Sequence, residues 1–277
     1  MTSPDRYAVM GNPIAHSKSP QIHQMFAQQC EQNITYEALL VETAAFIQSA
    51  NDFANNGGKG LNITVPFKQD AWALADVRSQ RAELAGAVNT LTWQQGQWLG
   101  DNTDGIGLVR DLVDNHNIQL QDKRILLLGA GGAVRGVIEP LLQQKPQQII
   151  IANRTASKAV DLASLFSQYG QISASSFEQL HGQNFDVIIN GTAASLQGDV
   201  PPIPANCISA DTVLYDMMYS AEPTAFMQWG LQQGAIKVID GLGMLVEQAA
   251  ESFFIWRKMR PQTQTVISHL RDLMQQQ

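Results

Sequence analysis

A glycine cluster, 129–133, comes directly after a predicted strand, 124–128, and offers a place for phosphate chemistry. Glycines let the backbone approach a phosphate closely, and a helix that begins there adds free N–H groups and a partial positive charge. Gly129 and Gly131 match the first two glycines of the dinucleotide motif G-x-G-x-x-G, whereas its third position falls at Val134. Many such clusters are simply tight turns, but the position inside a strand–helix–strand unit favours a nucleotide site.

The end of the next predicted strand, 148–152, indicates which nucleotide would bind. A site specific for NAD usually carries Asp or Glu there, and the carboxylate binds the ribose 2′-hydroxyl. This sequence instead reads Asn153-Arg154-Thr155, with Lys158 shortly after. Because the planar Arg guanidinium binds phosphate through two hydrogen bonds, these cations favour NADP over NAD. The alternative is a helix cap followed by two solvated cations.

A third region, residues 11–23, is rich in hydroxyl groups just before a predicted helix. Ser17 and Ser19 could together hydrogen-bond a carboxylate near the positive end of that helix. Helix capping alone would explain Ser19, but it explains Ser17 less well. Further along, Lys68 lies one turn past another predicted strand. Taken singly, it is more typical of a solvated turn than of a site.

Alternating strand and helix patterns must position these groups. The first part of the chain predicts a hairpin around Gln95-Gly96, strands at 6–10, 35–41 and 61–65, and helices at 20–32 and 43–55. After Asp101 the pattern restarts, with helices at 104–115 and 132–144 and strands at 124–128, 148–152, 186–190, 212–216 and 236–239. Such alternation predicts a parallel sheet covered on both faces. Two final helices within 244–274 are expected to fold back onto the first domain.

Length and composition limit the class of protein. The 277 residues exceed a typical single domain, so we expect two domains. The net charge of −7 argues against nucleic-acid or anionic-membrane partners. Two cysteines, Cys30 and Cys207, cannot form a disulfide framework or a thiolate zinc site, and we expect no metal. The sequence has neither a signal-peptide pattern nor an apolar stretch of about 20 residues, so we expect a cytoplasmic protein.

These segments together resemble the shikimate dehydrogenase family, and the match spans nearly the whole chain. The motifs that carry it are GNPIAHSKSPQIH (11–23), NITVPFK (62–68), GAVNTL (86–91), DNTDG (101–105), GAGGA (129–133), NRT (153–155), YDMMY (215–219) and DGLGMLVEQAA (240–250). The expected fold is α/β with two domains. An N-terminal α/β substrate domain would comprise 1–103 and 244–277, and a Rossmann-like nucleotide domain with a doubly wound parallel sheet would comprise 104–243.

The resemblance implies an NADP-dependent oxidoreductase that reversibly reduces 3-dehydroshikimate to shikimate in aromatic amino-acid biosynthesis. By this resemblance, Ser17 and Ser19 bind the substrate carboxylate, and Lys68 and Asp104 form the catalytic pair. The implied contacts to the rest of the substrate are Thr64, Asn89, Asp104, Tyr219 and Gln248. The implied contacts to NADP are Gly129, Ala130, Gly131, Gly132, Ala133, Asn153, Arg154, Thr155, Lys158, Met217 and Gly241.

Two alternatives differ from this hypothesis. One is a quinate/shikimate dehydrogenase with relaxed cofactor use, and the other is a nucleotide-sensing Rossmann protein without catalysis. The second predicts loss of Lys68 or Asp104, yet both are present. The stretch 190–193 reads Asn-Gly-Thr-Ala where relatives often have Asn-Ala-Thr-Ser, and His16 and His23 are expected to be structural. The oligomeric state stays open between monomer and homodimer.

Overall fold

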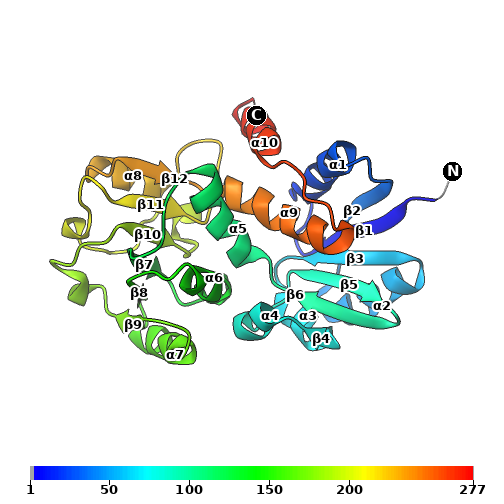
Figure 1. The fold of residues 1–277 in the computed structure, drawn as a ribbon, viewed down its shortest axis with the longest axis horizontal. Helices are drawn as coiled ribbons and strands as arrows, with labels where there is room; N and C mark the ends of the chain where they lie inside the picture. Colours follow the sequence, from blue (N-terminus) through cyan, green and yellow to red (C-terminus); the bar gives the residue numbers. More distant parts are fainter. Residues whose placement is uncertain (1–2, 277) are drawn as a thin grey trace. The chain divides into compact units, whose positions relative to one another are not determined.

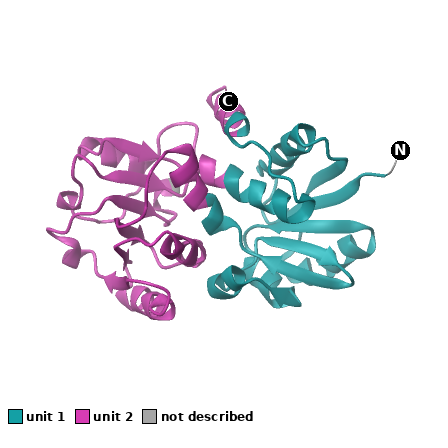
Figure 2. Ribbon diagram, viewed as in Figure 1, with its two compact units in different colours: residues 1–107, 246–266 teal, residues 108–245, 267–277 magenta. Residues whose placement is uncertain are grey.

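The computed structural model describes residues 3–276 and divides into two compact units, as Figures 1 and 2 show. The first unit contains the chain through Gly107 together with Val246–Val266. The second contains Leu108–Leu245 and the chain from Ile267 onward. Two units were expected from the chain length, and their division lies close to the change of pattern after Asp101.

The final helix differs from the expectation that all of 244–277 joins the first unit. Its last part belongs to the second unit. There, Arg271 donates hydrogen bonds to the backbone oxygen of Ser220 at 3.1 Å and to the carboxylate of Asp240 at 2.5 Å. These contacts, which depend on tertiary structure, hold the helix to the second unit.

The first unit is built on a mixed six-stranded sheet in the order β2-β1-β3-β5-β6-β4. The strands are β1 (Asp5–Gly11), β2 (Ile34–Leu40), β3 (Gly58–Ile63), β4 (Val77–Arg78), β5 (Thr90–Gln94) and β6 (Gln97–Asp101). β1 pairs in parallel with β2 and β3, whereas β5 pairs antiparallel with β3 and β6. The predicted hairpin is confirmed, because Gln95 and Gly96 have φ values of 53° and 79° and connect β5 to β6.

Helices and a shared apolar core hold this sheet. The helices whose bounds fall largely in the first unit are α1 (Ser19–Gln29), the short 3₁₀ helix Thr43–Ala45, α2 (Phe46–Asn55), α3 (Lys68–Leu74), α4 (Gln80–Ala85) and α9 (Leu242–Arg257). The core includes Met10, Phe46, Phe53, Phe67 and Trp98. The strand β3 ends at Ile63, a few residues before α3 begins, and β6 ends at Asp101, shortly before residue 104. Polar side chains from separate motifs therefore lie just past the ends of two strands of this sheet.

The second unit contains a six-stranded, all-parallel sheet in the order β12-β11-β10-β7-β8-β9. The strands are β7 (Arg124–Leu128), β8 (Gln148–Ala152), β9 (Ile172–Ser175), β10 (Val187–Asn190), β11 (Val213–Asp216) and β12 (Lys237–Ile239). This is the doubly wound order, so the Rossmann-like prediction is confirmed. The chain reverses direction of winding between β7 and β10, and ligands of such sheets bind at the strand ends there.

Helices α6 (Gly132–Gln143), α7 (Ala156–Phe166) and α8 (Ala225–Gln232) connect these strands. The remaining elements are α5 (Asp104–Arg110), the π-helix Asp111–Asn115, 3₁₀ helices at Glu178–Leu180, Ala194–Gln197 and Ala205–Cys207, and α10 (Gln264–Gln275). The edge strand β9 has no counterpart in the sequence prediction, because its Ile-Ser-Ala-Ser sequence lacks an apolar run.

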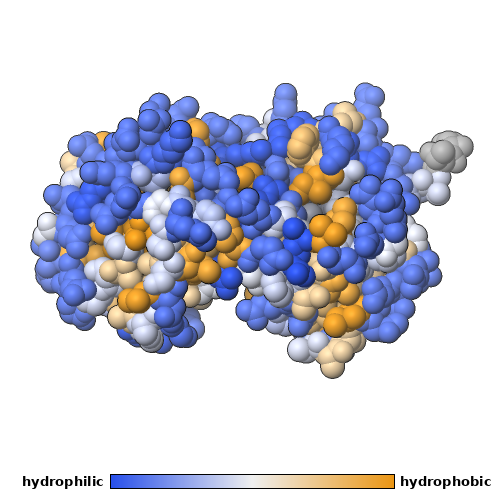
Figure 3. All heavy atoms as spheres, turned by 60° about the horizontal axis from the view of Figure 1, so that its bottom comes forward, coloured by the Kyte–Doolittle hydropathy of each residue, from blue (hydrophilic) through white to orange (hydrophobic). Residues whose placement is uncertain are grey.

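Figure 3 shows one face on which hydrophilic residues predominate, with smaller hydrophobic areas on both units. Within the described chain, every helix is too short or too polar to cross a lipid bilayer.

Candidate active site

Lys68 and Asp104 form an ion pair in the first unit, although 36 positions separate them in the chain. Lys68 is the first residue of α3 and Asp104 is the first residue of α5. Lys68 Nζ lies 2.5 Å from Asp104 Oδ2, and the two side chains are 31% and 15% exposed. The pair is therefore fixed in place but still reachable from outside, which is what a group that exchanges a proton with a ligand requires.

Asn89 orients the Asp104 carboxylate by binding Oδ1, the oxygen that Lys68 does not contact. The backbone N–H of Thr103 donates to Asn89 Oδ1 at 2.9 Å, so the opposite end of this amide must be the NH₂ group. That group donates to Asp104 Oδ1 at 2.8 Å and to Gln248 Oε1 at 3.2 Å. Three predicted substrate residues, Asn89, Asp104 and Gln248, are thus brought together, and Asn89 is only 2% exposed.

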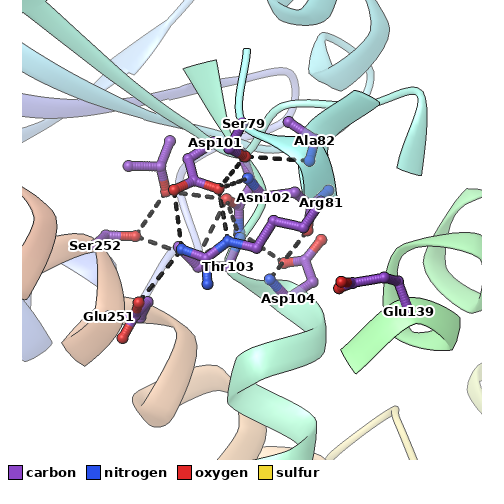
Figure 4. Close-up of polar contacts among 12 residues, drawn as sticks. Ser79, Arg81, Ala82, Asp101, Asn102, Thr103, Asp104, Glu139, Glu251 and Ser252 are labelled. Carbon is purple, nitrogen blue, oxygen red and sulfur yellow. Dashed lines mark hydrogen bonds and ion pairs between the residues drawn. The ribbon is translucent and has the colours of Figure 1, made fainter. Parts of the chain in front are cut away.

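A second ion pair fixes the segment that leads into Asp104 (Figure 4). Arg81 binds both carboxylate oxygens of Asp101, at 2.6 and 2.9 Å, and also approaches Glu251 at 3.3 Å. Burial alone would lower the pKa of Arg81, but Asp101 and Glu251 outweigh burial and raise it. The hydroxyl of Ser79 adds a 2.6 Å hydrogen bond to Asp101. Sequence reasoning missed Arg81, since nothing in its spacing connects it to Asp101.

The predicted carboxylate-binding serines lie at the start of α1. Ser17 Oγ accepts a 3.3 Å hydrogen bond from the backbone N–H of Ser19, which is 9% exposed. The loops after β1 and β3 meet at this edge of the sheet, because Thr64 N–H donates to the Met10 carbonyl at 3.0 Å. A side chain at Gly11 would overlap Thr64, so the close approach requires glycine there.

The two histidines of the first motif differ in their surroundings. His16 is exposed, whereas His23 is fully buried and stacks on Tyr36 with ring centroids 4.2 Å apart. Burial lowers the pKa of His23 to about 3, and the nearby Asn62 opposes the shift only in part. A neutral, buried ring fits the expected structural role of His23.

In the second unit, the glycine cluster leaves open space at the start of α6. Gly129 has φ +107°, a conformation that favours glycine. A Cβ atom placed on Gly131 or Gly132 would meet no atom within 4 Å, and no side chain caps the N-terminus of α6. Ala130 and Ala133 complete this loop. The free N–H groups and the open space suit the pyrophosphate of a dinucleotide.

The end of β8 exposes the two predicted phosphate-binding cations. Arg154 and Lys158 are both exposed, and among residues 3–276 neither makes an ion pair. The Asn153 side chain donates to the carbonyl of Thr155 at 3.0 Å, and α7 begins directly after Thr155. Because no carboxylate competes for them, these cations suit the 2′-phosphate of NADP.

The turn after β10 packs against the glycine loop. Asn190 Oδ1 accepts hydrogen bonds from the backbone N–H and hydroxyl of Thr192, at 3.1 and 2.7 Å. A Cβ atom at Gly191 would overlap Val134. A larger residue at position 191 would therefore require the Val134 side chain to move.

Three further predicted residues follow β11 and β12 in the second unit. Gly241 approaches Met217 so closely that a Cβ atom at Gly241 would overlap the Met217 backbone. Tyr219 is partly exposed, and burial together with Asp240 raises its pKa.

Across the described residues, no three His, Cys, Asp or Glu side chains gather as a metal site would require.

Three family models match the chain. The shikimate dehydrogenase substrate binding domain matches residues 9–91, shikimate/quinate 5-dehydrogenase matches 111–197, and the shikimate 5′-dehydrogenase C-terminal domain matches 241–271.

Curated relatives match over nearly their whole length. Shikimate dehydrogenase (NADP(+)) of Marinobacter nauticus is 56% identical over 271 residues, covering 96% of this chain and 98% of the relative. The protein of the same description from Nitrosococcus oceani is 55% identical, covering 97% and 95%.

Solved structures match the fold as well. An Ael1 enzyme from Pseudomonas putida has a TM-score of 0.93 at 46% identity, covering 96% of this chain and 98% of that chain. Shikimate 5-dehydrogenase from Thermus thermophilus, solved in complex with NADP(H) and shikimate, has a TM-score of 0.86 at 30% identity, covering 97% and 99%.

Proposed function

The chain belongs to the shikimate dehydrogenase family, and we propose that Lys68 and Asp104 are the catalytic pair of its reaction. The enzyme is an NADP-dependent oxidoreductase that reversibly reduces 3-dehydroshikimate to shikimate, a step of the shikimate pathway to aromatic amino acids. The observation that carries the assignment of the pair is the 2.5 Å contact between Lys68 Nζ and Asp104 Oδ2 in a partly exposed position.

Lys68 moves the proton in this proposal. When bound, NADPH supplies the hydride that adds to the substrate carbonyl carbon. The carbonyl oxygen gains negative charge as its C=O bond becomes a single bond, and it needs a proton to become the product hydroxyl. The Lys68 ammonium donates that proton from Nζ, and in the reverse direction neutral Lys68 accepts it. A placed proton donor of this kind contributes roughly 10²–10⁴-fold to the rate.

Asp104 keeps Lys68 in position. Its Oδ2 accepts from Lys68 and its Oδ1 accepts from Asn89, so both oxygens are occupied by donors. Asp104 therefore orients the Lys68 ammonium toward the substrate oxygen and contacts the neighbouring hydroxyl, as the family resemblance implies.

The remaining residues bind and orient the two ligands. Ser17 and Ser19 hold the substrate carboxylate, and the ring contacts are Thr64, Asn89, Tyr219 and Gln248. The glycine loop 129–133, which leads into α6, binds the NADP pyrophosphate, and Arg154 and Lys158 bind its 2′-phosphate. The other proposed cofactor contacts are Asn153, Thr155, Met217 and Gly241.

The first unit, which includes Val246–Val266, is the proposed substrate domain. The Rossmann-like second unit is the proposed NADP domain. We also propose a cytoplasmic enzyme, monomeric or homodimeric, that acts on small anions and has no nucleic-acid or membrane partner. The net charge of −7 supports the last point. Light scattering on a size-exclusion column would report the oligomeric state.

The direct test follows the absorbance of NADPH and of NADH, separately, with 3-dehydroshikimate and with 3-dehydroquinate. We expect the highest kcat/KM with NADPH and 3-dehydroshikimate. Comparable rates with 3-dehydroquinate would favour a quinate/shikimate dehydrogenase, and no oxidation of either cofactor would contradict the enzyme assignment.

A further inference from the structure

A continuous series of hydrogen bonds runs through the interior of the first unit and ends at Asp104. It begins at Tyr36 in β2, whose hydroxyl donates to Asn62 Oδ1 in β3 at 2.7 Å. Because Oδ1 accepts this bond, the NH₂ group of Asn62 points to the other side, where it donates to Thr90 Oγ1 at 3.3 Å and to Ser252 Oγ at 3.0 Å.

The next bond reaches the residue that orients Asp104. Thr90 Oγ1 donates to Asn89 Oδ1 at 2.9 Å, and Asn89 Nδ2 in turn donates to Asp104 Oδ1 at 2.8 Å. Thr90 is fully buried and Asn62 is 6% exposed, so water does not compete for these groups. Inside a protein such bonds polarise one another, and each strengthens the next.

The Tyr36 hydroxyl is the donor at the other end of the series. Burial raises the pKa of Tyr36 well above its usual value of 10.0, so the phenol keeps its proton and remains the donor to Asn62. The donors therefore all point the same way, in the order Tyr36, Asn62, Thr90 and Asn89, and Asp104 is the final acceptor.

We propose that Tyr36 is a positioning residue for the reaction, which fixes the orientation of Asp104 through the buried hydrogen bonds of Asn62, Thr90 and Asn89. The inference rests on the proposed function of Asp104. Each bond of the series polarises the next, and Asp104 holds Lys68 in its productive position only when the series is intact.

The substitution Tyr36→Phe tests this directly. It keeps the ring that stacks on His23 at 4.2 Å and removes only the hydroxyl. We expect kcat for 3-dehydroshikimate reduction at saturating NADPH to fall at least about tenfold. The KM for NADPH should stay within roughly twofold, because Tyr36 belongs to the other unit from the glycine loop.

Tyr7→Phe is the matched control. Tyr7 is also a buried tyrosine of the first unit, and it stacks on Trp256 at 4.6 Å while its hydroxyl contacts Arg257 at 3.4 Å. It has no bond to the series, so this variant should keep wild-type kcat. If Tyr7→Phe lowers kcat as much as Tyr36→Phe does, general loosening of the unit explains both and the proposal is wrong.

A second pair of variants interrupts the series elsewhere and gives a readout that a purely structural role would not move. Thr90→Val keeps the shape of the side chain and removes its hydroxyl, so it should reproduce the loss of kcat, whereas Thr90→Ser should retain most of kcat. The double variant Tyr36→Phe/Thr90→Val should be little worse than either single variant, because both interrupt one series. Multiplicative losses in kcat would overturn the proposal.

The controls also separate this proposal from the proposed function. If the wild-type protein shows no NADPH oxidation, the function and the inference fail together. If the wild type is active and Tyr36→Phe and Thr90→Val both keep wild-type kcat, the function stands and the role of Tyr36 is wrong. Should Tyr36→Phe fail to fold, the comparison of Thr90→Val with Thr90→Ser decides alone.

Discussion

Lys68 Nζ lies 2.5 Å from Asp104 Oδ2, and each residue begins a helix that follows a strand of the same sheet. This placement gives the pair its rigidity, because the strand ends fix the helix starts. The Asp104 carboxylate is further held by Asn89, and the chain before it is held by the Arg81–Asp101 ion pair. The position of Lys68 and Asp104 therefore depends on the contacts of Asn89 and of the Arg81–Asp101 pair as well as on their own ion pair.

Asp101→Asn should lower both stability and turnover. The substitution keeps the size of the side chain but removes the charge that binds Arg81, and Arg81 is only 20% exposed. We expect a loss of about 1.5–3 kcal/mol in the free energy of unfolding, measured by urea denaturation. Since Asp101 fixes the backbone before Asp104, kcat should fall as well.

Glu37→Gln provides the matched control for Asp101→Asn. Glu37 pairs with Arg6 at 3.1 Å, but both side chains are more than 40% exposed, at 48% and 42%. Its loss should cost less than about 1 kcal/mol and leave kcat unchanged. Equal losses at the two sites would show that the Arg81–Asp101 pair has no special structural role.

His23 should make the protein less stable in acid. The folded-state pKa of His23 is about 3, whereas an unfolded histidine has a pKa of about 6.5. Between these values the unfolded chain binds a proton that the folded protein does not. The stability due to neutral His23 is thus complete above about pH 6.5 and falls with decreasing pH, by up to about 1.4 kcal/mol per pH unit.

The variant His23→Phe tests that slope. The free energy of unfolding, measured in urea from pH 4 to pH 7, should depend less steeply on pH than in the wild type. His181→Phe replaces an exposed histidine and should keep the wild-type slope. An unchanged slope in His23→Phe would mean that His23 titrates normally in the folded protein.

Arg154→Ala should weaken NADPH selectively. A charge-assisted contact to the 2′-phosphate is lost, so the KM for NADPH should rise roughly tenfold or more. NADH lacks this phosphate and serves as the control within the same variant, with a KM close to that of the wild type. A similar rise for both cofactors would mean that Arg154 acts through the fold of the loop and not through the phosphate.

Local patterns predicted much of this molecule from the sequence. The strand leading into Gly129 and the cations after the next strand identified the Rossmann-like unit, because these features lie within short segments. The turn at Gln95-Gly96 identified the hairpin for the same reason. Lys68 and Asp104 were found through ordered motifs of the family, and the structure brings them within 2.5 Å.

The supporting contacts could not be predicted, because they join segments far apart in the chain. Tyr36 and Asn62 meet only through the register of β2 and β3 on either side of β1. Arg81 meets Glu251 across 170 positions. The last helix joins the second unit through Arg271, and no local pattern encodes that choice.

Lys68→Ala removes the ammonium group that is proposed to exchange a proton with the substrate oxygen. Steady-state kcat with 3-dehydroshikimate and NADPH should fall by roughly 10²–10⁴-fold. Equilibrium binding of shikimate should stay within roughly tenfold, since the lost interaction acts mainly in the transition state. Lys59→Ala, at an exposed lysine of β3, should leave both quantities unchanged. A folded Lys68→Ala enzyme with near wild-type kcat would show that the proton comes from another group.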